Sequence, residues 1–139
     1  MSRVFPKSHR SDVLRLLLGT LYAVGALIHG YFALVAPDLY LVFADMALVA
    51  AYRELWLAVV VPNLGVLLPA VILFEAGVAV ALLWRGPTVT VGNLAGGCFQ
   101  LGLVLSGPWG VINLGLALVH FYLARFEFSR PAIRLKTRV

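Results

Sequence analysis

The stretch Val71-Ile72-Leu73-Phe74-Glu75-Ala76-Gly77-Val78-Ala79-Val80-Ala81-Leu82-Leu83-Trp84 holds a single carboxyl group in an otherwise apolar run. No other charged residue lies between Glu54 and Arg85. An apolar segment of this length predicts a membrane-spanning helix, in which a carboxyl group costs several kcal/mol unless it is paired, hydrated or protonated. Glu75 therefore predicts an integral membrane protein with a polar interior.

The overall composition agrees with that prediction. The chain has 139 residues, of which 62% are hydrophobic and only 12% are charged. Water-soluble domains contain about twice that share of charge, so this class is not favoured. Four membrane spans of about 20 residues each would use most of the chain and leave only short loops. The one cysteine, Cys98, excludes both an internal disulfide and a CxxC thiol site.

Apolar runs predict an all-α fold, an integral membrane four-helix transmembrane bundle in a single domain covering residues 1–139. The expected spans are residues 13–35, 61–84, 88–106 and 109–125, with Pro37 and Gly107-Pro108 marking turns. Residues 39–56 are apolar but carry Asp45, Arg53 and Glu54, and we interpret this segment as an interfacial or re-entrant helix. The alternative is a fifth span over residues 39–60.

The positive charge gathers at the two ends of the chain. Nine of the eleven Lys and Arg residues flank the first and last expected spans: Arg3, Lys7, Arg10, Arg15, Arg125, Arg130, Arg134, Lys136 and Arg138. Such flanks are typical of the cytoplasmic side and of contact with anionic lipid. We therefore expect a multi-pass protein of the cell inner membrane with both termini cytoplasmic. Membrane lipids are the expected partners, and nucleic acid is not.

Polar residues inside the spans are the candidate ligand-binding residues. With each span centred in the bilayer, Tyr22, Glu75, Asn93 and His120 fall in a cytoplasmic layer, and His29, Gln100 and Asn113 fall in an outer layer. We expect Glu75 to face the bundle and to pair with His120 or Tyr22, and burial to favour its neutral form. The bland alternative is that these side chains only join helices through hydrogen bonds.

Other chemistry has little support in the sequence. There is no HExxH, P-loop or GxGxxG pattern in a suitable context. His29 and His120 are expected in different leaflets, so no metal site is predicted. The spacing Gly92-Asn93-Leu94-Ala95-Gly96 is a GxxxG pattern, which indicates close helix packing. We favour packing within the chain, and a homo-oligomer remains an alternative.

The first two expected spans carry a recognisable pattern: Leu17-Leu18-Gly19-Thr20-Leu21-Tyr22-Ala23-Val24-Gly25-Ala26-Leu27-Ile28-His29-Gly30, then Pro37, then Leu73-Phe74-Glu75-Ala76-Gly77-Val78-Ala79-Val80-Ala81-Leu82-Leu83. This pattern resembles the DoxX-like family of small four-span membrane proteins. It covers about half of the chain. It implies a membrane partner of redox complexes, in some members linked to quinone reduction, with Glu75 and His29 as the positions to carry over.

Three functions follow as hypotheses. The first is a non-catalytic accessory subunit that binds a hydrophobic ligand, a quinone or a lipid, or docks a membrane redox complex, with no covalent cofactor. The second is a proton-coupled small transporter or channel that titrates Glu75. The third is a membrane-embedded lipid or isoprenoid enzyme that uses Glu75 and His120 as an acid–base pair.

Overall fold

Helices make up most of the part of the chain that the structure describes, and that part contains no strand. This computed structural model describes residues 9–133, and the helices are α1 (His9–Val35), α2 (Leu39–Asp45), α3 (Ala50–Leu55), α4 (Leu64–Leu83), α5 (Pro87–Gly102) and α6 (Gly110–Leu123). Two short irregular turns, η1 (Trp56–Val60) and η2 (Val61–Asn63), join α3 to α4. The all-α prediction is confirmed. Arg3, Lys7, Arg134, Lys136 and Arg138 lie outside the described residues.

Two helices are long and apolar enough to cross a membrane. They are α1, with 27 residues, and the continuous helical run Ala50–Leu83, with 34. The other two expected spans form shorter helices, α5 with 16 residues and α6 with 14. At about 1.5 Å of rise per residue these reach roughly 24 and 21 Å, which is less than the ~30 Å of a bilayer core. The four-span arrangement therefore stays a prediction.

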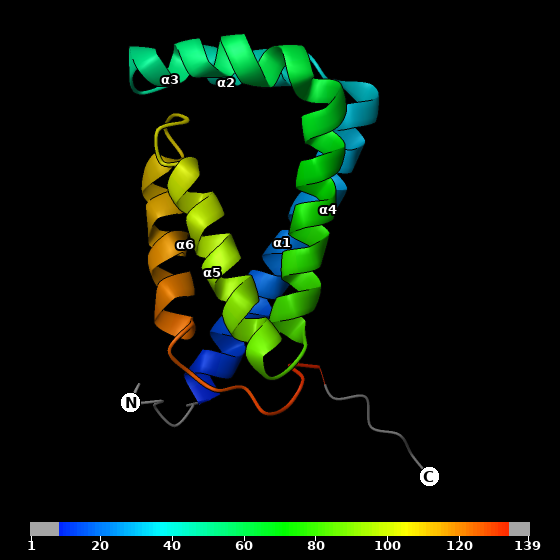
Figure 1. Cartoon of the computed structure of the whole chain (residues 1–139), viewed down its shortest axis with the longest axis vertical. Coiled ribbons are helices and arrows are strands. Elements are labelled where there is room, and N and C mark those ends of the chain that lie inside the picture. Colours follow the sequence, from blue (N-terminus) through cyan, green and yellow to red (C-terminus); the bar gives the residue numbers. More distant parts are fainter. Residues whose placement is uncertain (1–8, 134–139) are drawn as a thin grey trace.

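Residues 39–60 form a hairpin instead of a straight fifth helix. The helices α2 and α3 run side by side across one end of the molecule, and the chain then bends sharply into α4 (Figure 1). Pro62 lies in η2 and cannot supply the N–H that a regular helix needs there. The wide turn η1 and the tight turn η2 replace the regular α-helical hydrogen-bond pattern around Pro62. Helices commonly kink at such places.

The four longest helical segments form two pairs. Helix α1 packs along α4, α5 packs along α6, and α4 joins the pairs through its contact with α5. The pairs meet near residues 83–87 and spread apart toward the α2–α3 hairpin (Figure 1). We call the end near Trp84 the narrow end and the end under the hairpin the wide end. The buried hydrophobic core includes Leu82, Val89 and Leu123 and lies at the narrow end.

A buried arginine closes the narrow end. Arg15 donates to the backbone carbonyls of Trp84 and Arg130, both at 3.1 Å, and pairs with Asp12 at 3.2 Å. Its guanidinium also lies 4.4 Å from the centre of the Phe128 ring. Arg15 therefore links the segment after α6, which contains Phe128 and Arg130, to α1 and to the end of α4. Arg15 is only 1% exposed, so its assignment to a lipid-facing basic flank was wrong.

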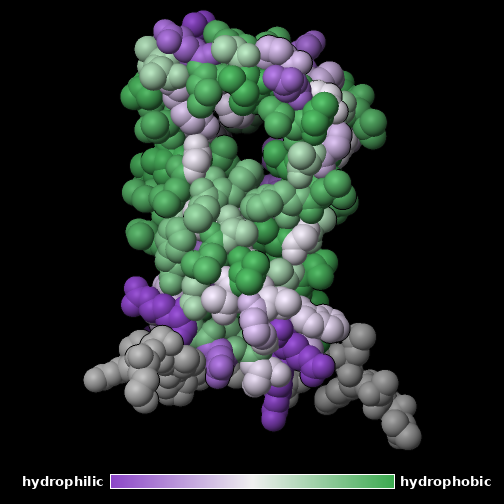
Figure 2. Space-filling model, viewed as in Figure 1, coloured by the Kyte–Doolittle hydropathy of each residue, from purple (hydrophilic) through white to green (hydrophobic). Residues whose placement is uncertain are grey.

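The outer surface of the helices is strongly apolar. Among the most exposed large side chains are Leu34, Val111, Leu27, Leu73 and Val66, each 73–88% exposed and together drawn from α1, α4 and α6. Figure 2 shows a broad apolar band around the middle of the visible face, with hydrophilic residues gathered at both ends. A monomeric soluble protein rarely exposes so much contiguous apolar area.

Candidate ligand cavity

The wide end encloses a cavity of about 370 Å³ beneath the hairpin. Its lining is mostly apolar, and the lining residues come from the hairpin, α1, α4, α5, the α5–α6 connection and α6. The lining residues are His29, Tyr40, Phe43, Trp56, Val60, Leu64, Leu67, Leu68, Val71, Phe99, Leu103, Ser106, Trp109 and Asn113. The space-filling view shows an opening at this place, under the band formed by the hairpin (Figure 2). A hollow of this size and lining is typical of small-molecule sites.

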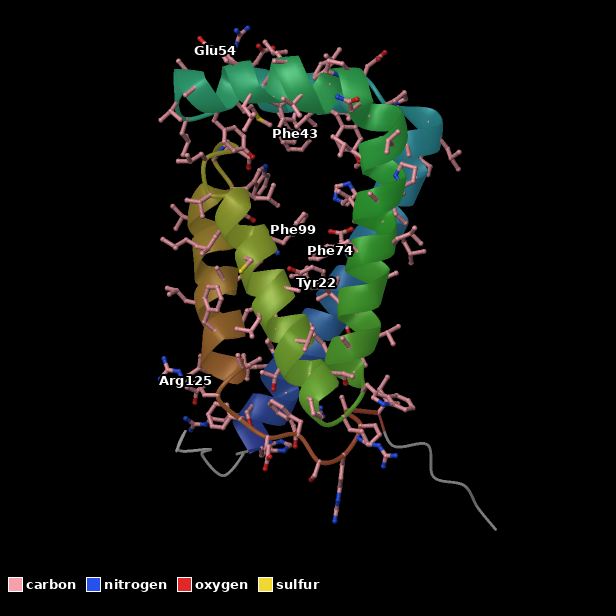
Figure 3. The ribbon with its side chains drawn as sticks, viewed as in Figure 1. Tyr22, Phe43, Glu54, Phe74, Phe99 and Arg125 are labelled. Carbon is pink, nitrogen blue, oxygen red and sulfur yellow. The ribbon has the colours of Figure 1, made fainter. Side chains whose placement is uncertain are left out.

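A second, smaller hollow of about 200 Å³ continues toward the narrow end. It shares His29, Phe99, Leu103 and Asn113 with the first, and it adds Leu21, Tyr22, Gly25, Glu75, Gln100 and Leu116. Figure 3 shows Phe43 under the hairpin, Phe99 and Phe74 below it, and Tyr22 deeper still. The Phe74 and Phe99 rings lie 5.0 Å apart. We call the two spaces the outer hollow and the inner hollow.

His29 stands where the two hollows meet. Its Nδ1 lies 2.6 Å from the hydroxyl of Tyr40, and its Nε2 lies 3.7 Å from Oε1 of Glu75. Burial, and secondarily the charge of Glu75, raises the pKa of the Tyr40 hydroxyl, which therefore stays a donor at neutral pH. If Tyr40 donates to Nδ1, the ring hydrogen sits on Nε2 and faces the Glu75 carboxyl. Tyr40, His29 and Glu75 thus form one polar row.

Hydrogen bonds at both ends of the hairpin hold it in place. The indole Nε1 of Trp56 donates to the backbone carbonyl of Tyr40 at 2.7 Å, which ties η1 to α2. At the far end of the hairpin, the Tyr52 hydroxyl donates to the carbonyl of Gly102 at 3.2 Å, and the backbone N–H of Leu48 donates to Leu105 at 3.0 Å. The hairpin therefore touches both helix pairs and roofs the outer hollow.

Glu75 faces the interior as predicted, but its partner is His29 and not His120. The residue is 6% exposed, and its Oε2 has no hydrogen-bond partner among the described residues. A side chain at Gly25 would place its Cβ 3.0 Å from Oε1, so the glycine makes room for the carboxyl group. His120 was the wrong partner because α4 packs on α1, whereas His120 belongs to α6. Tyr22, the other expected partner, lies on α1 and lines the same hollow as Glu75, but its hydroxyl bonds with Gly96 and Gln100.

His120 belongs to a separate, tightly packed polar cluster. Asn93 donates its amide hydrogen to the carbonyl of Val89 at 2.9 Å, so its Oδ1 accepts from Nδ1 of His120 at 3.1 Å. A Cβ at Gly96 would lie 2.6 Å from the His120 ring, which shows how closely α5 and α6 approach. No hydrogen bond or ion pair joins Glu75 and His120 in the described part of the chain, so the expected acid–base pair is not formed.

Tyr22 and Gln100 lie between the two polar groups. The Tyr22 hydroxyl donates to the carbonyl of Gly96 at 3.1 Å and accepts from Nε2 of Gln100 at 3.3 Å. The other amide atom, Oε1 of Gln100, is buried with no hydrogen-bond partner in the described residues. Asn113 donates to the carbonyl of Leu103 at 3.0 Å. Tyr22, Gln100 and Asn113 therefore serve both as links between helices and as walls of the hollows.

The structure divides the seven candidate residues into two sets. His29, Tyr22, Glu75, Gln100 and Asn113 line the hollows, whereas Asn93 and His120 do not. The sequence did not indicate Tyr40 and Trp56 as cavity residues, because both belong to segment 39–56, which we interpret from the sequence as an interfacial or re-entrant helix. Only the fold of the hairpin brings them over His29. In residues 9–133, no group of three or more His, Cys, Asp or Glu side chains is arranged to hold a metal ion.

Comparison of the chain with protein-family models, with curated proteins and with solved structures gave no match. The DoxX-like resemblance therefore stays a prediction that rests on the motifs of α1 and α4.

Proposed function

We propose that this protein is a multi-pass membrane protein whose wide end binds a hydrophobic ligand, a quinone or a lipid, as an accessory subunit of a membrane redox complex. Support for the membrane setting comes from the two helices of membrane-crossing length and from the exposed apolar band (Figure 2). The shorter helices α5 and α6 are expected to cross with help from their flanking turns or from local thinning of the bilayer.

One observation carries the ligand proposal. An apolar hollow of about 370 Å³ leads into a smaller one that ends on buried polar groups, and His29 borders both. That order matches a ligand with an apolar body and a single polar head. Leaving the Oε2 of Glu75 without a partner is costly in an apolar setting, and a bound polar head removes that cost.

A cavity-filling variant tests the binding proposal. We expect Leu67→Trp, whose position lines the outer hollow, to lower the amount of quinone or lipid that co-purifies in mild detergent by several-fold. The matched control is Val66→Trp, because Val66 is 73% exposed and lies outside the hollow. Mass spectrometry of solvent extracts gives the amount of each small molecule per protein chain. Equal amounts in wild type and Leu67→Trp would contradict the proposal.

The row of Tyr40, His29 and Glu75 favours a second candidate, a proton-coupled transporter. Two substitutions separate the candidates. Glu75→Gln keeps the shape and hydrogen-bonding capacity of the side chain but cannot titrate, and Glu75→Ala removes both. A ligand-binding role predicts that Gln retains most of the co-purified ligand while Ala loses it. A transport role predicts that both variants abolish proton flux in reconstituted vesicles.

An accessory subunit should co-purify with the other chains of its complex. Mild-detergent purification from the native membrane should recover stoichiometric partner chains, and reconstitution of the protein alone should show neither transport nor lipid turnover. Recovery of the chain alone, together with either activity, would overturn the accessory role and leave the ligand site to be explained otherwise.

Topology gives an independent check. If the chain spans the membrane an even number of times, cysteines introduced at positions 5 and 135 should label from the cytoplasmic side only. Both positions lie outside the described residues. The native Cys98 is exposed and is replaced by Ala in this background. Labelling from opposite sides would mean an odd number of crossings.

A further inference from the structure

In the described part of the chain, the buried side-chain atoms of the inner hollow that lack any hydrogen-bond partner are both oxygens. The Tyr22 hydroxyl donates to Gly96, and the amide nitrogens of Gln100 and Asn113 donate to Tyr22 and Leu103. Two oxygen atoms remain without a hydrogen-bond partner among the described residues, Oε2 of Glu75 and Oε1 of Gln100. Both side chains are more than nine-tenths buried and both line the inner hollow. An unpaired buried acceptor is strongly disfavoured.

We propose that the ligand is a hydrophobic alcohol, whose hydroxyl group enters the inner hollow and donates its hydrogen to Glu75 or Gln100 while its apolar body fills the outer hollow. This inference rests on the proposed function, which requires a hydrophobic ligand but leaves its polar head open. The class includes long-chain and isoprenoid alcohols and the reduced, hydroxyl-bearing form of a quinone. A ligand whose only polar group is a carbonyl cannot donate to Oε1 of Gln100. A hydroxyl group can donate there, and because it also accepts, it can bond with Glu75 in either protonation state.

The position of His29 supports the proposed orientation of the ligand, with its hydroxyl group in the inner hollow. Nε2 of His29 lies 3.7 Å from Oε1 of Glu75, and the other carboxyl oxygen, Oε2, has no hydrogen-bond partner among the described residues. The aromatic ring of Phe99 and the aliphatic side chain of Leu103 border both hollows, so they lie where the hydroxyl end of the ligand would join its apolar body. A hydroxyl is small enough for this inner space of about 200 Å³, whereas the apolar body fits the larger outer one.

A nearly isosteric pair of probes tests the inference: hexadecan-2-ol and hexadecan-2-one, each carrying two bromine atoms on the chain. Bromine quenches tryptophan fluorescence at short range, and Trp56 and Trp109 both line the outer hollow. Trp84 is replaced by Phe to remove the remaining signal. A Trp56→Phe, Trp109→Phe variant that keeps Trp84 reports the partitioning of each probe into the detergent.

We expect the alcohol to bind about tenfold more tightly than the ketone, which is the size expected for one hydrogen bond to a buried, otherwise unpaired acceptor. Glu75→Leu or Gln100→Leu should reduce that ratio toward one. Thr88→Ala is the control, because Thr88 lies on α5 outside both hollows and its hydroxyl already donates to the carbonyl of Arg85 at 2.8 Å. The ratio compares two probes on the same protein, so a partly unfolded variant does not distort it.

The remaining outcomes separate the two proposals. If both probes bind equally, water fills the inner hollow, and the inference about the hydroxyl group is overturned while the ligand cavity stands. If the ketone binds more tightly, Glu75 acts as a donor and the inference is again overturned. If neither probe quenches above the detergent baseline and Leu67→Trp leaves the extracted molecules unchanged, the proposed function itself fails.

Discussion

The two ends of this bundle use buried polar groups in opposite ways. At the narrow end, Arg15 reaches two backbone carbonyls, an aspartate and an aromatic ring, and it fastens the segment after α6 to the helices. At the wide end, Glu75 keeps one oxygen without a partner beside an open space. The first arrangement stabilises the fold. The second leaves binding capacity unused, and unused capacity next to a cavity is typical of a functional site.

The largest effect should come from the narrow end. Arg15→Ala removes two hydrogen bonds to carbonyls and the contact with Phe128, so we expect a loss of about 3 kcal/mol in the free energy of unfolding. Thermal unfolding in detergent measures it. Arg10→Ala, on the same helix but exposed, is the control and should change little. A stability loss no larger than that of the control would break the comparison between the two ends.

The next effect tests the tight approach of α5 and α6. Gly96→Ala brings a Cβ within 2.6 Å of the His120 ring, and such overpacking typically costs about 2 kcal/mol. The control is Gly115→Ala on α6, where nothing lies within 4 Å of an added Cβ. There the change should be neutral or slightly stabilising, because alanine favours helices over glycine. Equal melting temperatures for the two variants would contradict the packing described around His120.

A smaller effect is expected at the roof of the cavity. Tyr40→Phe removes the hydrogen bond to His29 but keeps the ring, so the free energy of unfolding should fall by about 1 kcal/mol. Hydrogen exchange should also speed up at the amides of α2, because the hairpin is then held to α1 less firmly. Tyr31→Phe, on an exposed position of α1, is the matched control. Unchanged exchange in α2 would mean that the bond does not secure the hairpin.

The smallest effect on stability should come from Glu75 itself. Glu75→Gln replaces a carboxyl group that lacks one partner, so we expect a change within about 1 kcal/mol of wild type. The same melting assay measures it. Glu75 would then contribute little to the free energy of unfolding and much to ligand binding. A stability loss as large as that of Arg15→Ala would mean that Glu75 stabilises the fold. The two ends of the bundle would then use their buried polar groups in the same way.

Much of the helical pattern could be predicted from residues alone. Apolar runs and the breaks at Pro37 and Gly107-Pro108 place the helices to within a few residues of the structure, apart from the shorter ends of α5 and α6. The interior position of Glu75 also followed from the cost of a carboxyl group among apolar residues. These properties depend on each segment's own composition, so no knowledge of its neighbours was needed.

The partners of the polar residues were decided by the tertiary structure. Successive side chains along a helix point about 100° apart. A small error in the predicted depth or rotation of a helix therefore gives a side chain the wrong neighbour. Glu75 meets His29 because α4 packs on α1, and His120 meets Asn93 because α6 packs on α5. The cavity depends further on the hairpin that folds back from Pro37 to Pro62. The sequence therefore determined that Glu75 is buried, because a carboxyl group among apolar residues is costly. Tertiary packing determined that Arg15 is buried too, and which polar groups face an open space.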